Sequence, residues 1–233
     1  SALKKLNSNS EFLTLFVIND NNIIIGTITD GDIRRGIIYG LGNENPISDF
    51  MNINFTFLIK GKYEKEKIDL IKLKKLEIIP VLNEDGSLYR IIDFNKVKTI
   101  LPIDAVIMAG GIGSRLMPLT ENTPKPMLKI GEKPIMEYNV DLLKSYGISH
   151  LTLSVKYLAN IIEDYYKDGA DKEMDISYVT EIEPLGTIGA VKQIKTIHND
   201  YILVMNSDLL TNINWEAMFD EYDLFSPPSF DEN

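Results

Sequence analysis

Residues 106–126 read VIMAGGIGSRLMPLTENTPKP, an apolar run that breaks into a glycine-rich segment. The apolar residues predict a buried β-strand over 105–109. Gly110, Gly111 and Gly113 follow this strand directly, and glycines let the backbone turn sharply and approach a ligand closely. The free N–H groups of such a turn form an anion-binding nest. The stretch therefore predicts a strand whose carboxyl end is built to hold an anionic ligand.

Strands and helices alternate along the chain from residue 104 onward. The apolar spacing predicts an α/β fold with a Rossmann-like, mostly parallel sheet that is covered by helices on both faces. Ligands of such sheets bind beyond the carboxyl ends of the strands. The strands are expected at 105–109, 151–155, 176–179 and 201–205, and the helices at 135–146, 158–166 and 189–197.

The segment after the glycines carries positive charge. Between residues 110 and 134 four basic residues face two acidic ones, although the whole chain has a net charge of −10. Arg115 offers a planar fork of donors that suits phosphate oxygens. Lys125 stands between two prolines, which keep its backbone stiff and extended. These features could make up a glycine-rich turn with solvated charges, but their combination after one buried strand favours a phosphate site.

The composition limits the class of protein. At 233 residues the chain is long enough for two domains, and its 44% hydrophobic and 25% charged residues are typical of a globular protein. No apolar run is as long as a membrane span and no secretory signal is present, so we expect a cytoplasmic location. The negative net charge argues against nucleic-acid and membrane partners. Without cysteine, disulfides and thiolate metal sites are excluded.

A second candidate loop follows the strand expected at 201–205. Asp208 comes almost directly after this strand, so its carboxylate should emerge at the ligand edge of the sheet. A hard cation such as Mg²⁺ prefers oxygen ligands of this kind. Asp208 could instead be a turn or cap residue. The position favours a magnesium ligand.

The segment GGIGSRLMPLTENTPKPMLKIGEKPIMEY, residues 110–138, resembles the signature of the sugar-1-phosphate nucleotidyltransferases, also called nucleotide-sugar pyrophosphorylases. The resemblance runs from about residue 103 to residue 225. It implies that the backbone from Gly110 to Ser114 cradles a nucleoside triphosphate, that Arg115 stabilises the departing pyrophosphate and that Lys125 contacts the phosphates at the reacting centre. It also implies an aspartate that binds Mg²⁺ at the position of Asp208. The implied reaction joins the triphosphate to a sugar-1-phosphate, giving a nucleotide sugar and pyrophosphate.

A third loop, TEIEPLGTIGA at residues 180–190, resembles the base-recognition loop of the same family. Gly186 and Thr187 precede an expected helix start, where a ligand can approach closely. Glu181 matches the residue that meets the base edge, and a carboxylate can accept both N1–H and N2–H of guanine. GTP is therefore the expected substrate. Glu183 could take this part instead, or both glutamates could be solvated.

The catalytic domain of the family continues beyond the length of this chain. Its later part supplies a second metal-binding aspartate and most of the sugar contacts, whereas this sequence closes with SPPSFDEN. We therefore expect the chain to be catalytically incomplete as written. Two hypotheses follow: a guanylyltransferase of nucleotide-sugar biosynthesis, or a non-catalytic protein that binds or senses nucleotides through its N-terminal part.

That N-terminal part contains a weak internal repeat with an offset of about 64 residues. Each copy, beginning at residues 13 and 76, predicts a strand, a turn, a strand and a helix. A charged helix is expected between the copies, over 64–76, with one buried side formed by Ile68, Ile71, Leu73 and Leu76. The proline-containing stretch KTILPID then marks a boundary near Leu101, which gives domains 1–100 and 101–233.

The stretch GTITDGDIRR, residues 26–35, resembles a CBS domain, and the repeat resembles a tandem CBS pair, an α+β module. This implies that the module senses an adenine nucleotide, with Thr29 and Asp32 holding the ribose. The second copy has Asp93 and Lys96 at these places, so no second ribose site is expected. Thr29 and Asp32 could instead cap a helix, and the module could serve to form a homodimer. The chain begins inside the expected first helix, so we expect part of the module to precede it.

The two histidines, His150 and His198, have no metal-ligand partners at a useful spacing in the sequence. We expect both at the surface, with His198 ending a helix, where a positive charge is favourable.

Overall fold

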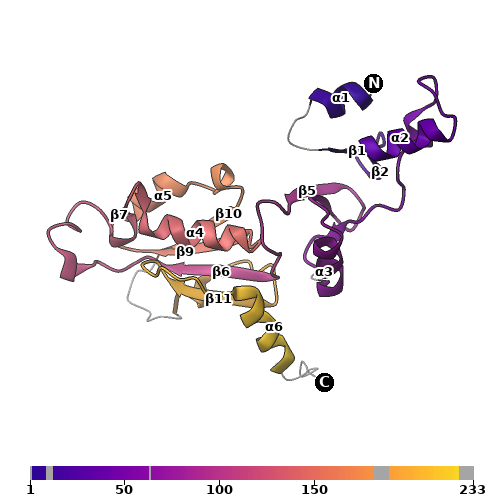
Figure 1. The fold of residues 1–233 in the computed structure, drawn as a ribbon. Helices are drawn as coiled ribbons and strands as arrows, with labels where there is room; N and C mark the ends of the chain where they lie inside the picture. The colour runs from indigo at the N-terminus through magenta and orange to yellow at the C-terminus, as the bar shows by residue number, and fades with distance from the viewer. Residues whose placement is uncertain (1, 9–12, 63, 181–188, 226–233) are drawn as a thin grey trace. The chain divides into compact units, whose positions relative to one another are not determined.

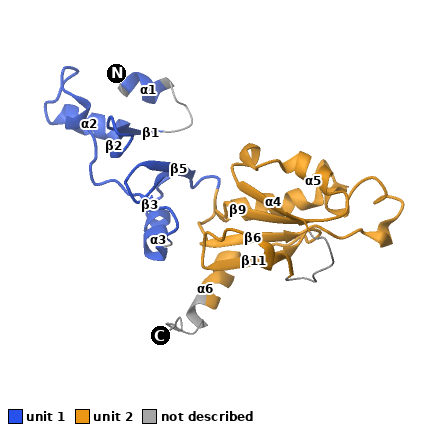
Figure 2. Cartoon of the chain, turned by 180° about the vertical axis from the view of Figure 1, so that it is seen from behind, with its two compact units in different colours: residues 1–96 blue, residues 97–233 orange. Residues whose placement is uncertain are grey.

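A computed structural model of the chain describes residues 2–8, 13–62, 64–180 and 189–225 (Figure 1). The chain divides into two compact units, residues 1–96 and residues 97–233 (Figure 2). This division lies just before the boundary expected near Leu101. Each unit buries apolar side chains of its own, such as Ile28 and Ile71 in the first and Ile107 and Leu153 in the second.

The second unit is built on a four-stranded sheet with the order β10-β9-β6-β11, in which every neighbouring pair is parallel. The prediction of an α/β fold with a parallel sheet is confirmed. Buried residues run almost without interruption along β6 and β9, as expected for central strands covered on both faces, although β9 alternates apolar residues with polar ones. The strands are β6 (Ile103–Met108), β9 (His150–Val155), β10 (Asp175–Thr180) and β11 (Tyr201–Asn206).

Two helices connect the first three strands and lie on one side of the sheet (Figure 1). Helix α4 (Ile135–Ser145) begins after Pro134 and ends before Gly147, whose φ of 71° suits a helix end. A Cβ on Gly147 would lie 2.6 Å from the carbonyl oxygen of Thr99, so only glycine fits there. Helix α5 (Ala159–Tyr166) buries Ile162 and Tyr166. These helices were predicted with nearly these bounds.

The helix expected over 189–197 is wrong in its extent. Only a short 3₁₀ helix, η5 (Gly189–Gln193), forms in this segment. Ala190 is buried, but Ile197, which the helical spacing places on the apolar side, is 52% exposed. Most helix stability in proteins comes from packing an apolar face, and this segment packs too little of one.

The remaining elements of this unit are short, except for the last helix. Helix α6 (Trp215–Phe225) buries Trp215 and Phe219, which lie one turn apart. The Trp215 ring lies 5.4 Å from the ring of Tyr146, centroid to centroid, at the end of α4. The short elements are η2 (Ser114–Leu116), η3 (Lys125–Met127), β7 (Lys129–Ile130), β8 (Lys133–Pro134) and η4 (Ala170–Lys172).

The first unit contains two antiparallel hairpins, β1-β2 and β4-β5, and the short strand β3 pairs with β4 in parallel. The strands of both copies of the repeat thus form as predicted. Its elements are α1 (Ala2–Ser8), β1 (Thr14–Ile18), β2 (Ile24–Thr29), α2 (Asp30–Ile38), η1 (Ile47–Asp49), β3 (Leu58–Ile59), α3 (Lys65–Leu73), β4 (Ile78–Leu82) and β5 (Leu88–Asp93).

Two details of the first unit differ from the predictions. Helix α2 follows the first hairpin, but residues 94–102 after the second hairpin are not helical. There the carboxylate of Asp93 accepts a hydrogen bond from the backbone N–H of Asn95 (2.9 Å), which favours a turn. In α3 the buried side holds Ile68 and Ile71, whereas Leu73, expected to be buried, is 80% exposed.

Among the helices of the described residues, none combines the length and the apolar character needed to cross a bilayer.

Candidate active site

The order of the strands predicts a ligand-binding crevice at the carboxyl edge of the sheet. From β6 the chain moves to β9 and β10 on one side, and then returns to place β11 on the other side of β6. Loops that leave adjacent strands in opposite directions open a crevice between them, where α/β proteins bind ligands. The strands β6 and β11 pair in register up to Met108 and Asn206, so the loops after these two residues begin side by side.

The glycine-rich loop after β6 makes a tight turn at Gly113. Its φ of 66° lies in the left-handed region, and a Cβ there would lie 3.0 Å from the Cβ of Lys125 and 3.1 Å from Cγ2 of Thr120. The buried hydroxyl of Thr120 donates a hydrogen bond to the carbonyl oxygen of Gly113 (3.0 Å). The turn is therefore packed directly against the segment that carries Lys125.

Lys125 and Asp208 meet although 83 residues separate them in the sequence. The Nζ of Lys125 lies 2.5 Å from Oδ2 of Asp208, and the two side chains are 37% and 33% exposed. The extended backbone predicted for Lys125 is wrong: Pro124 is extended, but Lys125 begins the 3₁₀ helix η3. This edge of the sheet thus presents a cation and a carboxylate that a ligand can still reach.

Asp208 owes its position to contacts that the sequence did not reveal. The N–H of Ser207 donates to the carbonyl oxygen of Met108 at the end of β6 (3.2 Å). The buried Asn139 of α4 donates from Nδ2 to the carbonyl oxygen of Ser207 (3.1 Å). The sequence signal for Asn139 is a polar residue between Met136 and Val140, on the apolar side of a helix.

The other residues expected to hold phosphate lie in the same loop. Ser114 and Arg115 are exposed in η2, and no ion pair joins Arg115 to the described residues. Gly110 and Gly111 come directly after β6. A Cβ on Gly111 would meet no atom within 4 Å, so packing within the protein does not require glycine there. A ligand that lies close to the backbone would require it.

The expected base-recognition residues Glu181, Gly186 and Thr187 lie outside the described residues, and so does the alternative Glu183. The described chain resumes at η5, and their role stays a prediction.

Thr29 and Asp32 belong to the first unit, where they form a capping box at the start of α2. Oδ2 of Asp32 accepts hydrogen bonds from the N–H of Thr29 (2.8 Å) and from its hydroxyl (2.6 Å). Burial acts to raise the pKa of Asp32, but these hydrogen bonds and the guanidinium of Arg35 outweigh it and hold the pKa below its usual value. The geometry matches the capping alternative, and ribose binding stays a prediction.

The expectation for the two histidines is confirmed only for the exposure of His198. The side chain of His150 is only 15% exposed, and its ring stacks on that of His198 with centroids 3.8 Å apart. His198 does not end a helix, because η5 stops at Gln193. Sequence spacing did not reveal this pair, since 48 residues separate the two positions.

A glycine turn, a lysine and a carboxylate that converge at the carboxyl edge of a parallel sheet are typical of phosphate-binding α/β proteins. The sequence profile of the nucleotidyl transferase family matches residues 104–223, about half of the chain, and the chain belongs to this family.

Several relatives transfer nucleotides to sugar phosphates, according to their names. The chain is 35% identical over 119 residues to a mannose-1-phosphate guanylyltransferase of Mycobacterium tuberculosis, covering 51% of this chain and 33% of that protein. It is 37% identical over 112 residues to a D-glycero-alpha-D-manno-heptose 1-phosphate guanylyltransferase of Campylobacter jejuni, covering 48% and 50%. It is 33% identical over 122 residues to a UTP–glucose-1-phosphate uridylyltransferase of Synechocystis, covering 47% and 31%. The chain thus spans a third to a half of the length of these curated relatives.

Proposed function

We propose that the second unit forms the nucleotide-binding half of a sugar-1-phosphate nucleotidyltransferase. The observation that carries this proposal is the meeting of Lys125 and Asp208 in the crevice between β6 and β11, beside the turn at Gly113. In the proposed reaction an oxygen of the sugar-1-phosphate attacks the α-phosphorus of the triphosphate. A new P–O bond forms as the bond to the β-phosphate breaks, and the electron pair leaves with pyrophosphate.

The loop after β6 would hold the triphosphate. The backbone N–H groups from Gly110 to Ser114 would donate to its oxygens, and the open space at Gly111 leaves room for that approach. Arg115 is exposed and would stabilise the charge that develops on pyrophosphate. Lys125 would contact the phosphates at the reacting centre. Catalysis would thus come mainly from positioning and charge neutralisation.

Asp208 is the residue that would hold Mg²⁺. Its carboxylate lies at the carboxyl edge of the sheet and is one-third exposed, which fits an ion that proteins bind through one or two carboxylates together with substrate phosphates. When bound, Mg²⁺ would supply positive charge that stabilises the phosphate oxygens. In the structure the ammonium group of Lys125 contacts the carboxylate of Asp208. It would shift from Asp208 to the phosphates as the substrate binds.

GTP is the proposed triphosphate. Two of the relatives named above are guanylyltransferases, and a carboxylate at Glu181 could accept both donors of the guanine edge. Gly186 and Thr187 would lie close to the same ligand. One relative is a uridylyltransferase, so the base must be measured.

For the first unit we propose a supporting role, regulatory or dimerising. If it binds an adenine nucleotide through Thr29 and Asp32, the ligand must compete with the capping box. Calorimetry with AMP and ATP, with Asp32→Ala as the control, separates the two roles. Heat of nucleotide binding in the parent that is lost in Asp32→Ala supports a nucleotide-sensing role. If the parent gives no heat with AMP or ATP, the capping box has only a structural role.

The direct test of the proposed activity is pyrophosphate release. The longest natural form of the protein that contains these 233 residues is assayed with GTP, CTP, UTP, dTTP and ATP, each with a panel of sugar-1-phosphates. We expect release with GTP and one of these sugars. Tight triphosphate binding without turnover in any pairing would sink the enzyme proposal and leave a non-catalytic nucleotide-binding protein.

A further inference from the structure

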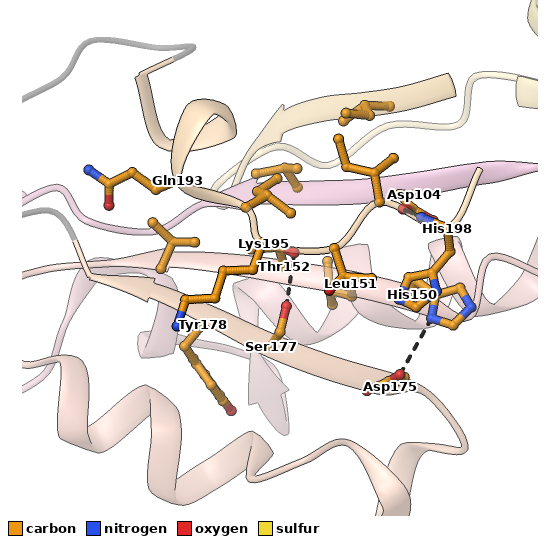
Figure 3. Close-up of a pocket in the computed structure, with 16 residues that line it drawn as sticks. Asp104, His150, Leu151, Thr152, Asp175, Ser177, Tyr178, Gln193, Lys195 and His198 are labelled. Carbon is orange, nitrogen blue, oxygen red and sulfur yellow. Dashed lines mark hydrogen bonds and ion pairs between the residues drawn. The ribbon is translucent and has the colours of Figure 1, made fainter. Parts of the chain in front are cut away.

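Three side chains with metal-binding groups converge at the amino-terminal edge of the parallel sheet. His150 begins β9 and Asp175 begins β10, and the two residues are direct partners in the strand register. His198 lies in the segment that leads into β11 (Figure 3). Strands of six residues separate this edge from the carboxyl edge by roughly 15–20 Å, so the cluster is distinct from Lys125 and Asp208.

The three side chains are close enough to share one ion. One ligand atom from each residue lies within 4.8 Å of the others. Nδ1 of His150 lies 3.5 Å from Oδ2 of Asp175. The rings of His150 and His198 are nearly parallel, with 13° between their planes, so they stand face to face at one end of a pocket (Figure 3).

The backbone around His198 is fixed by a buried carboxylate. Asp104, the second residue of β6, accepts a hydrogen bond from the backbone N–H of His198 (2.6 Å). Its other oxygen accepts one from Nδ2 of Asn199, also at 2.6 Å. Asp104 thus pins the irregular segment after η5 to the central strand, and His150 and Asp175 are fixed by their own strands. A site whose ligands are held in this way loses little entropy on binding.

The chemistry of the ligands selects the kind of ion. Two imidazoles with one carboxylate suit a borderline divalent ion such as Zn²⁺, whereas Mg²⁺ and Ca²⁺ prefer oxygen ligands alone. Zinc ligands stand about 2.0–2.2 Å from the metal, which places them roughly 3–3.5 Å apart in a tetrahedron. His150 and Asp175 already have this separation, and rotation of the exposed His198 side chain brings in the third ligand.

We propose that His150, Asp175 and His198 bind one Zn²⁺ or a similar divalent transition metal at the edge of the sheet opposite the catalytic crevice. The pocket beside them has a volume of about 420 Å³, which leaves room for water as the fourth ligand. The ion joins the starts of β9 and β10 to the segment before β11. It therefore acts as a clamp on a part of the unit where the expected helix does not form. This role is independent of the proposed transferase activity.

Calorimetric titration of the 233-residue chain with Zn²⁺, in the presence of excess Mg²⁺ to occupy sites that prefer hard ions, tests the proposal. We expect one equivalent to bind, and the affinity to fall at least tenfold in His198→Ala and in Asp175→Asn. Both side chains are exposed, so these variants should fold, and circular dichroism checks this. Asp171→Asn, at an exposed carboxylate in η4, is the matched control, and it should bind Zn²⁺ as the parent does.

Cobalt(II) gives a second, spectroscopic readout. Bound at this site it should show the ligand-field absorption of a site with nitrogen ligands, and His198→Ala should lose it while Asp208→Asn keeps it. The proposal is overturned if the parent chain binds no Zn²⁺, or if His198→Ala binds it as tightly as the parent. In either case the two histidines are only a stacked pair beside the carboxylate of Asp175.

Discussion

Replacing Asn139 by alanine is expected to destabilise the second unit by about 1–3 kcal/mol. The side chain of Asn139 is 1% exposed, and its Nδ2 donates to the carbonyl oxygen of Ser207 at 3.1 Å. Without this donor, the carbonyl oxygen of Ser207 has no hydrogen bond from Asn139, and burying an unpaired carbonyl group is unfavourable. A loss of about 2 kcal/mol, at a denaturant slope of about 2 kcal/mol per molar urea, lowers the unfolding midpoint by about 1 M.

The assay uses the single tryptophan of the chain, Trp215, which is buried against Tyr146 in the second unit. Its fluorescence during urea unfolding therefore reports on that unit and not on the first. The matched control is Asn160→Ala on the exposed side of α5, which should stay within about 0.5 kcal/mol of the parent.

An Asn139→Ala midpoint equal to that of Asn160→Ala would refute the structural role of this hydrogen bond. Asn139 also holds the residue before Asp208, so the variant should bind Mg²⁺ and GTP more weakly at temperatures where it is fully folded. Reduced stability with unchanged binding would mean that Asn139 supports the fold but does not position Asp208.

Two further predictions concern paired substitutions. Gly113→Ala should lower the stability of the second unit by about 1 kcal/mol or more in the same fluorescence assay, because φ is 66° and the new Cβ would lie 3.0 Å from the Cβ of Lys125. Gly111→Ala places its Cβ in open space, so it should leave stability unchanged but weaken triphosphate binding. Equal unfolding midpoints for the two variants would contradict this prediction. Asp32→Asn should speed hydrogen exchange in α2 by weakening its cap, typically worth about 0.5–2 kcal/mol. Because the pKa of Asp32 is lowered in the folded state, its stabilisation is present above the ordinary pKa of aspartate, near 3.9, and is lost as the pH falls through the folded value. In acid, the hydrogen-exchange rate of α2 in the parent should therefore approach that in Asp32→Asn. The control is Asp30→Asn, which removes an exposed partner of Arg34 and should change the exchange rate less. A difference in exchange rate between the parent and Asp32→Asn that does not change with pH would disprove the link between this cap and the protonation of Asp32.

Regular elements with strong apolar patterns were predictable from the sequence. Strand β6 and helices α4 and α5 form within one or two residues of the expected bounds, because a buried strand or a helix side leaves a local period in the sequence. The helix over 189–197 failed because its apolar spacing was real but Ile197 found no surface to cover it. Packing of this kind is decided by distant segments and not by the local pattern.

In the candidate site, too, residues with a local sequence signal were predictable, whereas contacts between distant segments were not. Asp208 was predicted from its place after a strand and Lys125 from its place between two prolines, and the pairing of β6 with β11 brings the loops that carry them together. Asn139 was missed because its partner is a backbone carbonyl 68 residues away. The cluster at His150 was missed for a similar reason, since strand register brings Asp175 beside it and only the fold brings His198.

Magnesium-dependent binding of GTP to the Asp208→Asn chain tests the assignment of the reacting centre most directly. Mg²⁺ should strengthen GTP binding to the parent and to Asp200→Asn, an exposed carboxylate just before the other end of β11. In Asp208→Asn the strengthening by Mg²⁺ should disappear, while binding without Mg²⁺ should be equal or tighter because Lys125 loses its partner. If Mg²⁺ strengthens GTP binding to Asp208→Asn as much as to the parent, Asp208 is not the metal ligand and the reacting centre lies elsewhere.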